Sequence, residues 1–267
     1  KIQKKLKIKF IKPKNQPTDF RSSIKSIGVI SNQISKKVRK QYEDYPYPRW
    51  LQTKIIKNPI HWTELSKNTK IQVDKLITKD RTNILVVGCG TGQHSIGTAT
   101  KFKNCHVTAI DLSWASLEYA QRKTIEYGIK NIEYIQADLE DFSKLKYSFD
   151  IIEVMGVLHH TNAPVENWQK LTRLLKSGGI MRVGLYSTLA RKPILKYRER
   201  FFEKNKDYSV KELLDARKAI IGSQKNGLER IICSSDFFST SGFRDLLFHS
   251  HETTFSIQEI KGSLEKL

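Results

Sequence analysis

Short apolar runs alternate with amphipathic stretches through the middle of the chain, between residues 82 and 186. Five of these runs have the length and composition of buried strands: 83–87, 106–110, 131–136, 149–155 and 180–186. Three stretches between them carry apolar residues at helical spacing: 93–103, 113–127 and 164–176. Strands that alternate with helices of this length predict an α/β fold with a doubly wound, mostly parallel sheet.

The N-terminal part of the chain departs from this pattern. Leu6, Ile8 and Phe10 alternate with lysines at the spacing of a strand, and prolines then interrupt the pattern. A short helix is predicted at 35–43. The next segment, 45–50, alternates prolines with aromatic residues and cannot continue the helix.

The C-terminal part of the chain is predicted to be helical. Residues 190–230 are charged and resemble an insertion after the fifth strand, and residues 257–267 form a final predicted helix. We therefore expect three parts: a basic extension at 1–50, a core at 51–189, and a helical part at 190–267.

Composition limits the classes of protein and the cellular compartments that fit this chain. Hydrophobic residues make up 39% of the 267 residues, which is consistent with a packed core. No apolar run reaches the roughly 18 residues that a membrane-spanning helix needs. Cys89, Cys105 and Cys233 show neither a pairing pattern nor metal-ligand spacing. We therefore predict a reduced, cytoplasmic location and no metal site.

The positive charge of the chain is concentrated near its start. The formal net charge is +20, and the first 60 residues hold 16 Lys and Arg against 3 Asp and Glu. Such a segment can meet acidic proteins, nucleic acid or an anionic membrane surface. It can equally be a solvated leader, because charge alone describes solubility and steering rather than fold.

A glycine run follows the first predicted strand of the core. Gly88, Gly90 and Gly92 are spaced by two, whereas a dinucleotide fingerprint would need a glycine at the position of Gln93. The run also lacks the lysine of a phosphate-binding P-loop. It brings bare backbone to the start of a helix, so it indicates either a nucleotide-like ligand or a tight turn.

Acidic residues end the next two strands. Asp111 can accept hydrogen bonds from both hydroxyls of a ribose, and Asp138 can accept one from an exocyclic adenine amine. The backbone amide of Leu139 can donate to the adenine ring. Each aspartate can also be a simple helix cap. Ligands of open α/β sheets bind at this edge, however, and the three strand ends face it in order.

These residues resemble the class I S-adenosylmethionine-dependent methyltransferases, whose fold is Rossmann-like. The resemblance rests on five ordered motifs: ILVVGCGTGQ at 84–93, VTAIDLS at 107–113, IQADLEDF at 135–142, FDIIEVMGVLHHTNAP at 149–164 and LLKSGGIMRVGLYS at 174–187. Two further segments, QYEDYPYPRW at 41–50 and DFFSTSGFRDLLFHSHE at 236–252, resemble bacterial tetratricopeptide-associated and rickettsial-type protein-lysine methyltransferases.

The resemblance implies a set of S-adenosylmethionine contacts. The glycines would pack against the methionine part and the ribose, Asp111 would hold the ribose with Leu112 beside the adenine, and Asp138 and Leu139 would read the adenine edge. Glu153 and Gly156 would line the side of the methyl donor. Many members carry an acid two residues before the first glycine, where it helps to hold the ammonium group of the cofactor. Val86 occupies that position here.

Further residues are candidates for the acceptor side. His159 follows the fourth predicted strand, and a histidine there can act as a general base or simply pack in the loop. Tyr45, Tyr47 and Trp50 are predicted to form an aromatic slot that favours a neutral lysine amine. Tyr186, at the end of the fifth predicted strand, can be a pocket wall or a packing residue.

Three functions remain open at this point. The first is methylation of a protein, at lysine. The second is methylation of a small molecule or of RNA, which the basic N-terminus would attract. The third is a cofactor-binding fragment without turnover, because class I methyltransferases usually add two antiparallel strands after such a final helix and none is visible here. The helical insertion can cover the substrate or form a homodimer surface.

Overall fold

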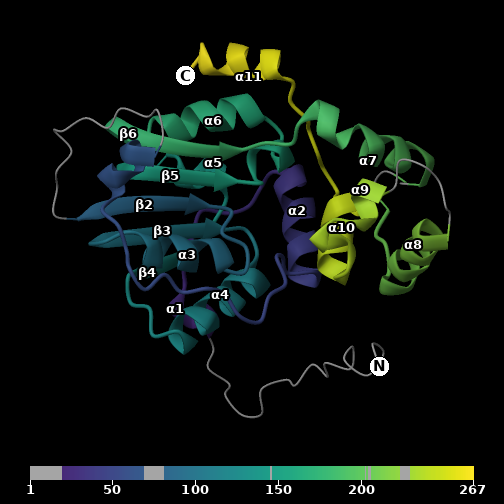
Figure 1. Cartoon of the computed structure of the whole chain (residues 1–267), viewed down its shortest axis with the longest axis horizontal. Helices are drawn as coiled ribbons and strands as arrows, with labels where there is room; N and C mark the ends of the chain where they lie inside the picture. The colour runs from purple at the N-terminus through teal and green to yellow at the C-terminus, as the bar shows by residue number, and fades with distance from the viewer. Residues whose placement is uncertain (1–19, 69–80, 145, 202, 204–205, 223–228) are drawn as a thin grey trace.

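The computed structural model describes residues 20–68, 81–144, 146–201, 203, 206–222 and 229–267, and its centre is one parallel sheet (Figure 1). Its strands are β1 (Lys25–Ile27), β2 (Thr82–Val87), β3 (Cys105–Asp111), β4 (Ile132–Ala137), β5 (Phe149–Met155) and β6 (Leu175–Gly184). Their order is β1-β4-β3-β2-β5-β6, and every pair is parallel. The carboxyl ends of these strands therefore all lie at one edge.

Helices cover both faces of the sheet and one of its ends. The longer helices are α2 (Gln33–Asp44), α3 (Gln93–Lys101), α4 (Trp114–Glu126), α6 (Pro164–Thr172), α7 (Thr188–Phe201), α8 (Val210–Gly222), α10 (Thr240–Phe248) and α11 (Ile257–Leu264). The shorter ones are α1 (Phe20–Ser23), η1 (Trp62–Asn68), α5 (Leu139–Phe142), η3 (Leu158–His160), α9 (Glu229–Ile232) and η4 (Ser235–Phe237). No helix of the described residues is long and apolar enough to cross a membrane.

The strands divide the core into two layers because successive side chains point to opposite faces. On β2, Ile84 and Val86 belong to one cluster, which also holds residues of α3 and α4. Leu85 and Val87 belong to the other, which holds residues of α5 and α6. Burial on both faces explains why the central strands read as continuous apolar runs.

A third cluster lies in the helices beyond the sheet. Its members come mainly from α7, α8 and α10, and Leu213, Phe243 and Leu247 are fully buried among them. Figure 1 shows α2 standing across the end of the sheet, between the strands and α10. Helices from the N-terminal and C-terminal parts of the described chain therefore come together beyond the carboxyl ends of the strands.

The Rossmann-like, mostly parallel α/β fold expected from the sequence is confirmed. Three details differ. The edge strand β1 was not predicted, so part of the segment called an extension joins the sheet. The last strand begins at Leu175 rather than at residue 180, and the helix before it ends at Thr172. The predicted strand through Leu6–Phe10 lies outside the described residues.

After β6 the described residues form helices and one isolated bridge, between Ser187 and Phe255, and no further strand. The division into 1–50, 51–189 and 190–267 stays a prediction.

Candidate functional site

A cavity of about 730 Å³ lies at the carboxyl ends of the strands. One side of it is formed by the loops after β2, β3, β4 and β5, and the other by α2, the segment after it, and the helical C-terminal part. This volume is in the range of sites for nucleotide-sized ligands, and the position is where ligands of open α/β sheets bind.

Gly88 and Gly90 of the glycine run form the floor of this cavity, whereas Gly92 does not line it and lies against Ala120 and Tyr134. Gly90 shows why glycine is needed. Its φ of +51° lies in the left-handed region. A Cβ at this position would lie 2.3 Å from the carbonyl oxygen of Tyr47. The same oxygen accepts a hydrogen bond of 3.2 Å from the amide of Thr91. The glycine loop therefore contacts the proline- and aromatic-rich segment 45–50, and it also exposes its backbone to a ligand.

The two aspartates at the strand ends lie in the cavity wall with Leu112 and Leu139. The carboxylate of Asp111 accepts hydrogen bonds from the amides of Gly90 (2.8 Å) and Ser113 (2.9 Å). Burial raises the pKa of Asp111, although these two amides oppose the rise. Asp138 caps α5 through the amide of Glu140. Asp138 is therefore a helix cap, whereas Asp111 accepts from two loop amides and the cap of α4 is Ser113. Both side chains line the cavity, and their contacts to a cofactor remain predictions.

Glu153 supplies a carboxylate next to Val86, the position at which many class I methyltransferases carry an acidic residue. It lies on β5 directly opposite Val86 of β2, and its side chain is buried in the cavity wall. His94 Nε2 lies 3.0 Å from it, the Thr98 hydroxyl donates to it, and Arg182 lies 3.7 Å away. Burial alone would raise the pKa of Glu153, but these neighbours outweigh it and leave the pKa below its ordinary value.

Two tyrosine–aspartate pairs face the other half of the cavity. The Tyr42 hydroxyl donates to Asp245 at 2.7 Å, and the Tyr47 hydroxyl donates to Asp236 at 3.1 Å. Burial raises the pKa of both carboxyl groups, that of Asp245 to about 6. The ion pairs seen among the described residues do not include either carboxylate. Sequence reasoning missed both aspartates, since their partners lie about two hundred residues away.

The predicted aromatic slot is wrong for two of its three members. Tyr47 lines the cavity, but Tyr45 and Trp50 do not. The Tyr45 ring lies under the Arg244 guanidinium, 4.7 Å away. Trp50 is buried, and its Nε1 donates to the Thr91 hydroxyl at 3.0 Å. Tyr186, which the sequence suggested as a pocket wall, does line the cavity.

His159 does not lie in the cavity wall, contrary to the role predicted for it. It is 1% exposed, its ring stacks on Tyr186 at 3.8 Å between centroids, and neither ring nitrogen has a hydrogen-bond partner among the described residues. Burial lowers its pKa to about 4. A general base must reach its proton, so we assign no catalytic role to His159. The neighbouring His160 lines the cavity instead.

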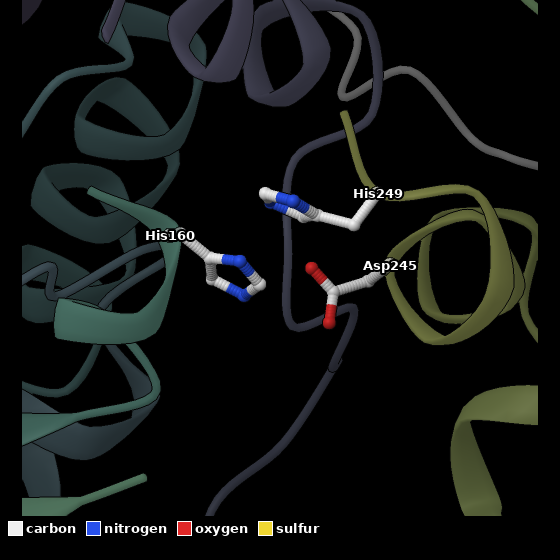
Figure 2. Close-up of side chains that lie close together, drawn as sticks. All are labelled: His160, Asp245 and His249. Atoms are coloured by element: carbon white, nitrogen blue, oxygen red, sulfur yellow. The ribbon is translucent and has the colours of Figure 1, made fainter. Parts of the chain in front are cut away.

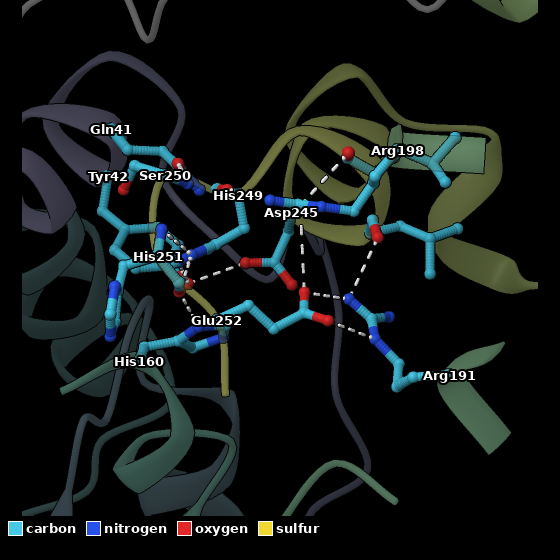
Figure 3. Close-up of polar contacts among 12 residues, drawn as sticks. Gln41, Tyr42, His160, Arg191, Arg198, Asp245, His249, Ser250, His251 and Glu252 are labelled. Carbon is cyan, nitrogen blue, oxygen red and sulfur yellow. Dashed lines mark hydrogen bonds and ion pairs between the residues drawn. The ribbon is translucent and has the colours of Figure 1, made fainter. Parts of the chain in front are cut away.

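The half of the cavity that contains Asp245 is held in place by a network of polar contacts between α2, α7 and the segment after α10 (Figure 3). The amide of Ser250 donates to Gln41 Oε1 at 3.0 Å, and Arg198 donates to the carbonyl of His249 at 2.8 Å. Arg191 and Glu252 form a buried ion pair. These contacts fix the position of Asp245, His249 and their neighbours relative to the sheet.

Comparison with known proteins identifies the class of the domain. A family model described as "Methyltransferase domain" matches residues 84–179. The chain therefore contains a class I methyltransferase domain, of the type that uses S-adenosylmethionine. The expectation for class and cofactor is confirmed, and the glycine floor with its flanking carboxylates fits such a cofactor.

Particular relatives show the range of this class. The chain is 32% identical over 132 residues to a ubiquinone biosynthesis O-methyltransferase of Paracidovorax citrulli, with 49% of this chain and 54% of that protein covered. It is 35% identical over 82 residues to a probable (S)-tetrahydroprotoberberine N-methyltransferase of Papaver bracteatum, with 31% and 23% covered. The chain thus spans about half or less of these relatives.

The fold is shared with a solved structure, PKMT2 from Rickettsia typhi. The TM-score is 0.61 at 18% identity, and the match covers 83% of this chain and 44% of that one. PKMT2 has also been solved in complex with AdoHcy. At this identity the likeness concerns the fold alone.

Proposed function

We propose that this domain transfers a methyl group from S-adenosylmethionine to an amine, namely the side chain of a lysine in a protein. The observation that carries the proposal is a pair of carboxylates, the half-buried Asp236 and the buried Asp245, each held by a tyrosine hydroxyl in the cavity wall. Carboxylates withdrawn from water without a cationic partner are costly, and an ammonium group would supply that partner.

The two halves of the cavity have separate tasks in this proposal. On the cofactor side, the glycine run approaches the ligand with bare backbone, Asp111 and Asp138 accept hydrogen bonds from ribose and adenine, and Glu153 holds the ammonium group. The cofactor supplies a methyl group already activated by its positive sulfur. The protein therefore needs mainly to align donor and acceptor and to exclude water.

On the acceptor side, the lysine ammonium lies between the two carboxylates and loses a proton to one of them. The nitrogen lone pair then forms the new N–C bond while the methyl–sulfur bond breaks, and the sulfur leaves as a neutral thioether. Tyr42, Tyr47 and Tyr186 surround this position and exclude water. An aromatic wall also suits a cationic acceptor.

Two further observations support an amine acceptor. The segments 41–50 and 236–252, which resemble protein-lysine methyltransferases, supply both tyrosine–aspartate pairs. One curated relative is named as an N-methyltransferase. A protein substrate, a cytoplasmic location and a homodimer remain parts of the proposal.

The test uses methyl-labelled S-adenosylmethionine and a cell lysate separated into protein, RNA and small-molecule fractions. We expect label in protein, recovered as methyl-lysine after hydrolysis, and none with Asp111→Ala. Asp236→Asn should lower kcat/KM by about 10- to 100-fold, because the acceptor loses a charge-assisted contact. Asp215→Asn, an exposed site on α8, is the matched control.

Other results would overturn the proposal. Label in RNA or small molecules, with none in protein, would exclude a lysine acceptor. Measurable cofactor binding without label in any fraction would favour a domain that binds the cofactor and does not turn over.

A further inference from the structure

Three potential metal ligands lie close together beside the cavity, which two of them, His160 and Asp245, also line (Figure 2). They are His160 of η3, Asp245 of α10 and His249, which follows α10 directly. One ligand atom from each lies within 4.8 Å of the others, and all three side chains are buried. Asp245 and His249 lie four residues apart, but His160 comes from a distant part of the chain, so spacing along the sequence could not reveal the complete set.

A single backbone carbonyl orients both imidazole rings. The oxygen of His251 lies 2.7 Å from Nδ1 of His160 and 2.6 Å from Nδ1 of His249. A carbonyl can only accept, so Nδ1 of His160 carries the proton and its Nε2 keeps a lone pair. The amide of His251 also donates toward Nδ1 of His249 at 3.1 Å, so for this ring the contacts allow either tautomer, and zinc at Nε2 would select the one with the proton on Nδ1. Metal-binding histidines are commonly held in this tautomer by a carbonyl on the other nitrogen.

One nitrogen of each ring lies within 4.8 Å of a carboxylate oxygen of Asp245. The two rings are stacked, with centroids 3.5 Å apart and planes at 22°. The Tyr42 hydroxyl lies 2.7 Å from Asp245 Oδ1 and 3.2 Å from Nε2 of His249. Its proton goes to the carboxylate at the shorter distance, so toward Nε2 of His249 the hydroxyl oxygen is an acceptor, and zinc would replace the proton on that nitrogen. No hydrogen bond to Nε2 of His160 occurs among the described residues.

We propose that His160, Asp245 and His249 bind one divalent transition-metal ion, with zinc as the ion tested. Two imidazoles and one carboxylate form a set that zinc accepts, and a tyrosine or water oxygen can complete four-fold coordination. Magnesium and calcium prefer oxygen ligands and are disfavoured here. Zinc bonds of about 2.0–2.2 Å require the ligand atoms to approach one another, which small rotations of the side chains achieve.

The site has a consequence that rests on the proposed function. The ion takes Asp245 and occupies the place of the acceptor ammonium. Zinc and the acceptor amine therefore exclude each other, while the cofactor half of the cavity is untouched.

The first test measures binding alone. The chelator-treated 267-residue chain is titrated with zinc against a chromophoric chelator, and with cobalt while visible absorption is recorded. We expect one ion per chain with an apparent Kd of about a micromolar or tighter, and cobalt bands of the intensity typical of four-coordination. Each of His160→Gln, His249→Gln and Asp245→Asn should weaken binding by about tenfold or more.

Controls separate this site from adventitious binding and from unfolding. His106→Gln and Cys233→Ser, which alter a histidine and an exposed thiol outside the cavity wall, should leave the affinity unchanged. Circular dichroism of every variant without metal establishes that it is folded. A wild-type chain that binds no zinc would overturn the proposal. So would folded ligand variants that bind as tightly as the wild type.

The second test addresses the acceptor. Zinc should raise the KM for the acceptor without changing the Kd for S-adenosylmethionine. An unchanged KM at saturating zinc would overturn the exclusion while the binding site stands. Because the binding test needs no acceptor, failure of the metal site and failure of the lysine function are distinguishable.

Discussion

At the scale of single residues, the most informative position is the missing acid before the glycine run. Val86 cannot hold an ammonium group, and the sequence suggests only backbone carbonyls or the segment around Tyr42–Trp50 in its place. The sheet register places Glu153 of the neighbouring strand directly opposite Val86. The carboxylate has moved by one strand, about 4.8 Å, and it faces the same cavity. A residue-by-residue comparison with the motif finds only the loss of the acid, whereas the structure places another carboxylate nearby.

This exchange predicts that Glu153→Gln weakens cofactor binding. A hydrogen bond to a charged group contributes roughly 1.5–3 kcal/mol, so the Kd for S-adenosylmethionine should rise by about 10- to 100-fold. Isothermal titration calorimetry measures the Kd. Glu133→Gln is the control, because Glu133 lies on β4 and pairs with the exposed Lys25. An unchanged Kd in Glu153→Gln would show that the ammonium group is held elsewhere.

Cofactor affinity should also depend on pH through Asp111. Burial raises the pKa of this carboxyl above its ordinary value of 3.8, so it takes up a proton at a higher pH than an exposed aspartate. The protonated group accepts hydrogen bonds poorly, and proton and cofactor therefore compete. As the pH falls from 7 to 4.5, the Kd should rise, by about tenfold per pH unit below the raised pKa.

Glu153 should not contribute to this profile, because its pKa is lowered and it stays ionised. Fluorescence titrations at several pH values would give the curve. Asp111→Asn should bind weakly at all pH values and show a flat profile. A sloping profile in that variant would assign the titration to another group.

Cavity residues were predicted from the sequence where they stand at the ends of recognisable strands, and were missed where only the tertiary fold brings them into the cavity. The glycines and Asp111 stand at the ends of strands that the sequence reveals, so topology alone brings them together. Asp236 and Asp245 lie on helical segments with no distinguishing local pattern. They become recognisable only when folding brings Tyr47 and Tyr42 to them.

At the scale of elements, α2 links the N-terminal segment to the core. Glu43, in its last turn, accepts hydrogen bonds from the amides of Trp114 (2.8 Å) and Ala115 (2.9 Å), at the start of α4. A carboxylate from one helix thus caps another, and it also faces the positive end of the helix dipole. Prediction from local sequence cannot see such a cap, because the partner lies 71 residues away.

We expect Glu43→Gln to lower the free energy of unfolding by about 1–2 kcal/mol, the usual size of a lost helix cap with its dipole interaction. Urea denaturation followed by circular dichroism measures it. Glu118→Gln is the control. It removes an exposed pair with Arg21 and should cost less than about 1 kcal/mol. Equal effects of the two variants would show that the cap contributes nothing beyond surface charge.

Among whole elements, the long periodic ones were predicted and the short one was not. The core strands β2 to β5 and helix α4 lie within one or two residues of their predicted bounds. The strand β1 has three residues, two of them exposed, and so it shows neither an apolar run nor alternation. The glycines at 178 and 179 suggested a helix end, but β6 runs through them.

At the scale of the whole molecule, the cavity has two halves with different origins. The cofactor half comes from a continuous stretch of sheet and loops. The acceptor half combines α2 and the segment after it with α10 and its flanks, from the two ends of the described chain. The two halves meet where the Tyr47 carbonyl lies against Gly90. This arrangement explains why the class was readable from sequence while the acceptor site was not.

The same arrangement predicts that defects in the two halves are separable except at their junction. Glu153→Gln should raise the Kd for S-adenosylmethionine and leave the KM for the acceptor nearly unchanged. Asp236→Asn should do the opposite. Gly90→Ala places a methyl group against the Tyr47 carbonyl at a backbone conformation that alanine rarely adopts, so it should weaken both. Calorimetry and initial rates at saturating second substrate give the two constants. If Gly90→Ala raised the Kd for S-adenosylmethionine but left the KM for the acceptor unchanged, the prediction would be wrong. That result would mean that a change at the Tyr47 carbonyl does not disturb the contact of Tyr47 with Asp236.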